Sequence, residues 1–141
     1  MGGALALIFA DTSGLYAALV AADQQHVDAR TAWLDLLARR QRLVTTSYVV
    51  HETVSLLQAR IGISAVLSWR TDIEPVLDIV WVDATLHRLA MAAVVASGRR
   101  DLSLTDWVSF EVMRQSRIRV ALAVDRHFLE QGFELLPKRS G

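Results

Sequence analysis

Short apolar runs alternate along the chain with longer segments whose apolar residues recur at helical spacing. The short runs have the length and composition of buried strands and fall at 4–10, 42–46, 77–82, 119–124 and 133–136. The longer segments predict helices at 13–22, 27–40, 47–60, 63–74, 84–97 and 104–116. The helical side chains expected to face the core include Leu34, Leu37, Leu56, Leu57, Leu89, Ala93, Trp107 and Phe110. This alternation predicts an α/β fold.

Continuously apolar strands that are joined through helices form parallel sheets covered on both faces. We therefore expect a three-layer α/β/α sandwich with a mostly parallel sheet of about five strands and right-handed crossovers. The chain has 141 residues and shows no repeat or linker, so residues 1–141 are expected to form one domain. In such sheets, ligands bind beyond the carboxyl ends of the strands.

Composition narrows the chemistry that this domain can perform. The absence of cysteine excludes disulfides, thiolate metal sites and cysteine nucleophiles, and it agrees with a reducing compartment. The N-terminal MGGALALIFA lacks the positive region of a signal peptide, and no apolar run reaches the roughly 18 residues of a membrane span. We therefore expect a cytoplasmic protein that is not associated with a membrane.

The charge balance excludes a protein that is basic over its whole surface. The formal net charge is +0 at pH 7, so any contact with RNA must be local. The basic residues gather in clusters, which are Arg39, Arg40 and Arg42, then Arg99 and Arg100, and then Arg114, Arg117 and Arg119. Each cluster has the chemistry to bind phosphate, and the simpler alternative for each is a solvated helix end.

Three acidic residues are placed at the sheet edge where ligands are expected. Asp11 and Asp125 each follow an apolar run directly, and Asp106 opens the helix at 104–116. Clustered carboxylates are hard oxygen ligands of the kind that Mg²⁺ or Mn²⁺ takes. The simpler alternative is helix capping, since Asp is a favoured N-cap and Ser103 with Asp106 resembles a capping box.

Glu52 is harder to explain by local structure. It lies at the edge of the apolar stripe of the helix at 47–60, and no lysine or arginine stands at 48, 49, 55 or 56 to pair with it. A carboxylate this close to a core needs a partner. We expect that partner to be a metal ion or an arginine from elsewhere in the fold.

Other candidate residues carry weaker signals. The histidines show no ligand spacing and are expected in packing or surface roles; they are His26, His51, His87 and His127. Ser13 lacks the G-x-S-x-G context of a nucleophile, and neither a Walker A nor a G-x-G-x-x-G motif occurs. Asp101 is expected at the surface, with a supporting charge beside the other acids as the alternative.

Taken in order, four segments resemble the PIN domain, and in particular the VapC-type toxins of toxin–antitoxin systems. These segments are DTSGLYAAL, HETVSLL, DLSLTDWVSF and AVDRHFLEQGF, and together they span nearly the whole chain. The resemblance assigns the acidic site to Asp11, Glu52, Asp106 and Asp125. One departure is Ala123, which stands where the family has Thr or Ser, so one supporting hydrogen bond is in doubt.

What the resemblance implies is an endoribonuclease that depends on Mg²⁺ or Mn²⁺ and leaves a 5′-phosphate and a 3′-hydroxyl. It also implies a homodimer and a small antitoxin whose C-terminal segment lies over the active site. Such a partner would lie on the early helices, which carry Trp33, Tyr48 and Trp69, although packing in the core is the simpler role for these rings. The rival functions are an RNA-processing PIN nuclease without an antitoxin and a non-catalytic PIN-like binding module.

Overall fold

A five-stranded parallel sheet forms the centre of the computed structural model, which describes residues 7–138. The strands are β1 (Ile8–Ala10), β2 (Leu43–Thr46), β3 (Leu77–Val80), β4 (Val120–Leu122) and β5 (Glu134–Leu136). Their order in the sheet is β3-β2-β1-β4-β5, and every neighbouring pair is parallel. The predicted strand at 4–10 is described only from residue 7 onward.

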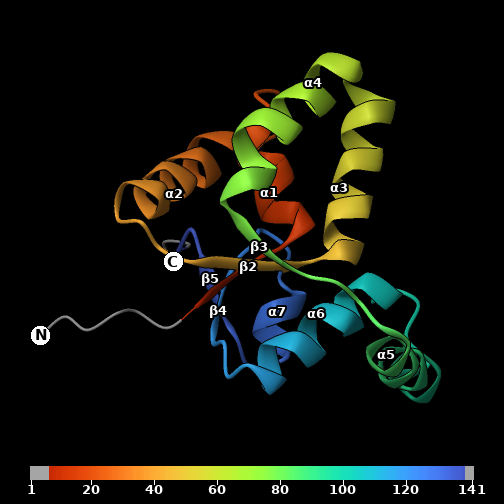
Figure 1. The fold of residues 1–141 in the computed structure, drawn as a ribbon. Helices are drawn as coiled ribbons and strands as arrows, with labels where there is room; N and C mark the ends of the chain where they lie inside the picture. Colours follow the sequence, from red (N-terminus) through yellow and green to blue (C-terminus); the bar gives the residue numbers. More distant parts are fainter. Residues whose placement is uncertain (1–6, 139–141) are drawn as a thin grey trace, which may run out of the picture.

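Helices cover both faces of the sheet, as Figure 1 shows with α1 to α4 above it and α6 and α7 below it. The helices are α1 (Thr12–Leu19), α2 (His26–Ala38), α3 (Ser47–Arg60), α4 (Ile63–Ser68), α5 (Ala84–Ser97), α6 (Leu104–Gln115) and α7 (His127–Glu130). This confirms the predicted three-layer α/β/α sandwich. Among the described residues, no helix combines the length and the apolar character that crossing a membrane requires.

The core is built from the apolar side chains that the strands and helices turn toward one another. Below the sheet, the ring of Phe128 lies between those of Phe9 and Phe110, at centroid distances of 6.4 and 5.1 Å. Above it, Trp33 and Trp69 are buried. A role for these two tryptophans in contacting a partner is therefore wrong, and the packing alternative holds for both.

Two predicted core residues, Leu34 and Leu89, are instead exposed, by 47% and 48%. The buried stripe of α2 runs through Ala29, Trp33 and Leu36, which leaves Leu34 about 100° away around the helix. Helix α5 packs mainly against α6 and buries only a narrow stripe, so Leu89 falls beside it.

The predicted helix at 63–74 is interrupted. After α4, the chain forms one π-helical turn (Trp69–Ile73) and one 3-10 turn (Glu74–Val76) before β3 begins. The Trp69 indole N–H donates to Glu74 at 2.9 Å, so the buried ring holds this turn in place. Burial of the Trp69 side chain therefore decides the backbone conformation here, and the apolar helical spacing of the sequence does not.

Gly14 brings helix α1 close to strand β4. A Cβ atom at this position would collide with the backbone carbonyl of Leu122. The absence of a side chain therefore lets the first turn of α1 lie directly on the carboxyl end of β4. This contact sets the spacing between the residues that follow β1 and those that follow β4.

Candidate functional site

The strand order places a crevice between β1 and β4. From β1 the chain moves outward to β2 and β3 on one side, and then to β4 and β5 on the other. Open parallel sheets bind ligands at such a reversal, beyond the carboxyl ends of the strands. Asp11 directly follows β1 and Asp125 lies shortly after β4, so both carboxylates stand at this crevice.

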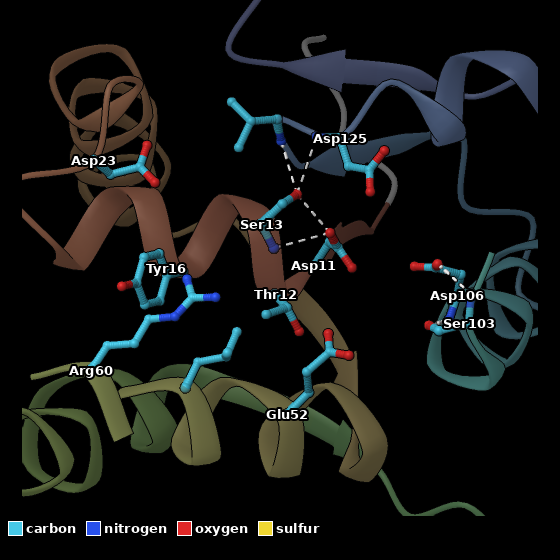
Figure 2. A pocket seen from close by; sticks show the side chains of 12 residues that line it. Asp11, Thr12, Ser13, Tyr16, Asp23, Glu52, Arg60, Ser103, Asp106 and Asp125 are labelled. Carbon is cyan, nitrogen blue, oxygen red and sulfur yellow. Dashed lines mark hydrogen bonds between the residues drawn. The ribbon is translucent and has the colours of Figure 1, made fainter. Parts of the chain in front are cut away.

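A cavity of about 310 Å³ opens at this edge (Figure 2). It is lined by Asp11, Thr12, Ser13, Tyr16, Asp23, Glu52, Leu56, Arg60, Ser103, Asp106, Val124 and Asp125. All four acids predicted for the site are in this set, together with Asp23, which was not predicted. Figure 2 shows the carboxylates of Asp11, Glu52 and Asp125 around the centre of the cavity, with Asp106 across from them.

The four acids share a cavity without closing around a single point. In the part of the chain that the structure describes, no group of three or more acidic or histidine side chains is close enough to hold an ion as it stands. Convergence on one cation would need side-chain rotation, above all by Asp106. The fit to a metal therefore depends on the chemistry of the acids and on their shared cavity, not on a formed coordination shell.

Asp11 is buried, with 4% of its surface exposed, and it caps helix α1. One of its oxygens, Oδ2, accepts hydrogen bonds from the backbone N–H and the hydroxyl of Ser13, at 3.0 and 2.6 Å. Burial, with a smaller contribution from the charges of Asp106 and Glu52, raises the pKa of Asp11 to about 7 against the lowering effect of these bonds. The cap and the perturbed carboxylate are the same residue.

Ser13 connects the two sides of the crevice. Its hydroxyl donates to Asp11 and accepts from the backbone N–H groups of Val124 and Asp125, at 3.0 and 3.2 Å. The loop after β4 thus receives a hydroxyl from α1, whereas Ala123 within that loop supplies none. Sequence reasoning considered Ser13 only as a nucleophile and missed this positioning role, for which its place in the first turn after Asp11 was the available signal.

Asp106 forms the predicted capping box with Ser103. Its Oδ2 accepts from the Ser103 N–H at 2.8 Å, and its own N–H donates to the Ser103 hydroxyl at 3.1 Å. Burial raises the pKa of Asp106, the bonds to Ser103 lower it, and the charges of Asp125 and Glu52 raise it. Asp106 therefore takes part in the cap of α6, and its pKa also responds to the charges of the other acids.

Asp125 holds the loop before α7 rather than capping that helix. Its Oδ1 accepts from the backbone N–H of His127 at 3.0 Å and lies 3.5 Å from the ring Nε2 of His127. The N-cap residue of α7 is Arg126, so the N-cap alternative considered for Asp125 is wrong by one residue. The contact with His127 fixes the orientation of this carboxylate beside the crevice.

Glu52 faces the cavity from α3 and is half-buried. None of the ion pairs found among residues 7–138 includes it. The arginine partner considered from the sequence is therefore not in place, and the charge of Glu52 adds to that of the other acids. A divalent cation would relieve this repulsion.

Capping leaves the carboxylates able to bind a cation. A carboxylate has two oxygens and about four acceptor sites, and each cap described above uses one oxygen. Several carboxylates in one cavity, two of them with raised pKa values, match the oxygen ligands that Mg²⁺ and Mn²⁺ take. The residues that could hold such an ion are Asp11, Glu52, Asp106 and Asp125.

The remaining candidates lie outside the cavity. No histidine lines the part of it that residues 7–138 form. His26 contacts the carbonyl of Ala17 at 2.8 Å, and His87 contacts the hydroxyl of Tyr48 at 2.6 Å, which agrees with packing roles. Asp101 is exposed and pairs with Arg99 at 2.7 Å, as expected of a surface residue.

Comparison with known proteins gives two findings. The family model described as PIN domain matches residues 8–134. Among solved structures, the chain is similar to the VapC20 toxin of Mycobacterium tuberculosis, described as cleaving the sarcin–ricin loop, with 34% sequence identity and a TM-score of 0.76. That match covers 89% of this chain and 95% of VapC20. A search of curated proteins found no match.

Proposed function

Because this chain belongs to the PIN domain family, we propose that it is a metal-dependent endoribonuclease and the toxin of a toxin–antitoxin pair. The observation that carries the proposal is the gathering of Asp11, Glu52, Asp106 and Asp125 in one cavity at the strand-order reversal. The similarity to a toxin that cleaves RNA supports the substrate class. The whole chain, residues 1–141, acts as one catalytic domain in this proposal.

In this proposal, the four acids hold Mg²⁺ or Mn²⁺. A bound divalent cation supplies activation of water and neutralisation of charge on the scissile phosphate. The chain's own contribution is positioning. Ser13 fixes Asp11 relative to the loop that carries Asp125, and Ser103 fixes Asp106. Hydrolysis breaks a phosphodiester bond of RNA and leaves a 5′-phosphate and a 3′-hydroxyl.

Among residues 7–138, no histidine lines the cavity, so proton removal from the attacking water falls to carboxylates or to the cation's own effect. The raised pKa of Asp11 belongs to the metal-free site, because a divalent cation beside this carboxylate would lower its pKa. In this proposal the four residues are therefore ligands first.

The toxin assignment brings partners with it. We propose a cytoplasmic homodimer that is inhibited by a small antitoxin whose segment covers the cavity. The genetic test is expression of the chain alone and with the protein encoded beside its gene. Toxicity that the neighbouring protein relieves supports the assignment, whereas a catalytically active but harmless chain favours an RNA-processing nuclease.

The biochemical test is cleavage of RNA by the purified chain. We expect cleavage with Mg²⁺ or Mn²⁺, none in EDTA, and products whose 5′ ends are phosphorylated. The double variant Asp11→Asn with Asp106→Asn should be inactive, and Asp101→Asn, which alters an exposed acid outside the cavity, should cleave as wild type does. Cleavage that continues in excess chelator would refute the metal-dependent mechanism.

A further inference from the structure

Among the described residues that line the candidate cavity, one is basic and five are acidic. Its charged lining residues are Asp11, Asp23, Glu52, Arg60, Asp106 and Asp125. An RNA strand is itself anionic, so a cavity with this lining repels its substrate unless positive charge is supplied. A divalent cation at the acids supplies part of that charge, and Arg60 is placed to supply more.

Arg60 shares one face of α3 with Glu52 and Leu56. The three residues are spaced four apart, which stacks their side chains on the same side of a helix. Arg60 stands eight positions after Glu52, which is a rise of about 12 Å along the helix. Arg60 therefore lies at the far end of the cavity from the proposed ligands, beside a different part of any bound strand.

The aromatic ring of Tyr16 holds the Arg60 side chain in place. The guanidinium carbon lies over this ring at 5.5 Å from its centroid, and Figure 2 shows the guanidinium reaching from α3 toward α1. Stacking on a ring uses the face of a guanidinium and leaves its N–H donors in the plane. Those donors have the geometry that a phosphate group accepts.

Arg60, like most arginines within residues 7–138, has no carboxylate partner, but it is the described arginine that lines the acid cavity. Arg39, Arg42 and Arg99 each form an ion pair, at 3.0, 2.9 and 2.7 Å. Within residues 7–138, no carboxylate lies within ion-pair distance of Arg60, although five acids line the same cavity. Within the described residues, no ion pair therefore occupies its guanidinium.

We propose that Arg60, held against Tyr16, binds a phosphate of the RNA strand other than the one that is cleaved. This inference rests on the proposed ribonuclease function and names the group that holds the strand at the far end of the cavity. The alternative is purely structural, because Arg60 stands in the last turn of α3, where a basic residue suits the helix dipole.

The test measures RNA binding without metal, so it does not depend on turnover. Fluorescence anisotropy in EDTA gives the Kd of a labelled oligouridylate for wild type, Arg60→Gln, Arg60→Lys and a control, Arg119→Gln. Arg119 is exposed and directly precedes β4, so it lies at the opposite edge of the sheet from the cavity. A thermal melt of each variant reports on the fold.

We expect Arg60→Gln to raise Kd roughly tenfold, the effect of losing one charge-assisted hydrogen bond. The dependence of log Kd on log salt should become shallower by about 0.7, as for one lost phosphate contact with a single strand. Arg60→Lys should keep the salt dependence, and Arg119→Gln should match wild type. The effect of Arg60→Gln should disappear with an oligomer whose backbone is uncharged methylphosphonate.

Two results would overturn the inference. One is a lower melting temperature for Arg60→Gln with an unchanged Kd, which would mean that Arg60 only stabilises helix α3. The other is a loss of affinity that persists with the methylphosphonate oligomer, which would mean that Arg60 contacts a nucleobase and not a phosphate. If wild type binds no oligomer and cleaves no RNA with Mg²⁺, the proposed function itself fails, whereas cleavage that Arg60→Gln leaves unchanged overturns only this inference.

Discussion

Replacing Asp11 by Asn should stabilise the metal-free protein at neutral and alkaline pH. The substitution removes a buried charge and retains a side-chain oxygen that accepts from Ser13, since Asn caps helices about as well as Asp. Burial raises the pKa of Asp11 from 3.8 to about 7 in the folded state. Each pKa unit is about 1.4 kcal/mol, so ionisation of Asp11 costs the wild-type fold about 4 kcal/mol.

The sign of the pH dependence follows from the direction of this shift. Between about pH 4 and about pH 7, the folded protein keeps the Asp11 proton that the unfolded chain has already lost. Wild-type stability therefore falls as pH rises through this window. The Asn variant lacks this fall, so its advantage should be close to zero near pH 4 and approach about 4 kcal/mol above pH 7.

The assay is urea unfolding in EDTA from about pH 5 to about pH 8, followed by tryptophan fluorescence, which four tryptophans provide. The control is Asp83→Asn, because Asp83 caps α5 through the Leu86 N–H at 2.9 Å and lies outside the acid cavity. The change in free energy of unfolding caused by Asp83→Asn should not increase with pH. Adding Mn²⁺ should stabilise wild type more than Asp11→Asn. Parallel pH profiles for wild type and Asp11→Asn would refute the reasoning.

Three further variants test how the site is positioned. Gly14→Ala should destabilise the fold by about 1–3 kcal/mol in urea unfolding, because the new Cβ collides with the Leu122 carbonyl. Ser13→Ala should lower the free energy of unfolding by about 1–3 kcal/mol and weaken Mn²⁺ binding in calorimetry, because it leaves the loop after β4 without its acceptor. Ser103→Ala should lower the melting temperature by the equivalent of about 1 kcal/mol and leave cleavage measurable. An unchanged stability in any of the three contradicts the contact assigned to it.

The capping and the catalytic interpretations of the acids turn out not to exclude one another. Asp11 and Asp106 do cap their helices, as the local sequence predicts. Each capped helix begins at the cavity, so the residue that ends the loop also faces the site. The roles of these acids as metal ligands remain predictions, and the variants above test them.

The sequence misjudged features that depend on which neighbour an element meets. Leu34 and Leu89 fit the apolar period of their helices, yet each lies beside the narrow stripe that the neighbouring element covers. The segment at 63–74 has a helical pattern, but burial of Trp69 imposes tighter and wider turns on it. Apolar periodicity reports the existence of a helix more reliably than the width of its buried face.

The sequence by itself determined the parallel α/β architecture and the placement of acids after strands. Both are local properties. The apolar periods of strands and helices can be recognised in short stretches of sequence, and a residue that follows a parallel strand lies at the carboxyl end of that strand. Only the tertiary structure decided that β1 lies beside β4, that Ser13 reaches the N–H groups 111 and 112 residues away, and that Arg60 enters the acid cavity. These contacts join distant segments through strand order and the close approach at Gly14, and no local pattern encodes either.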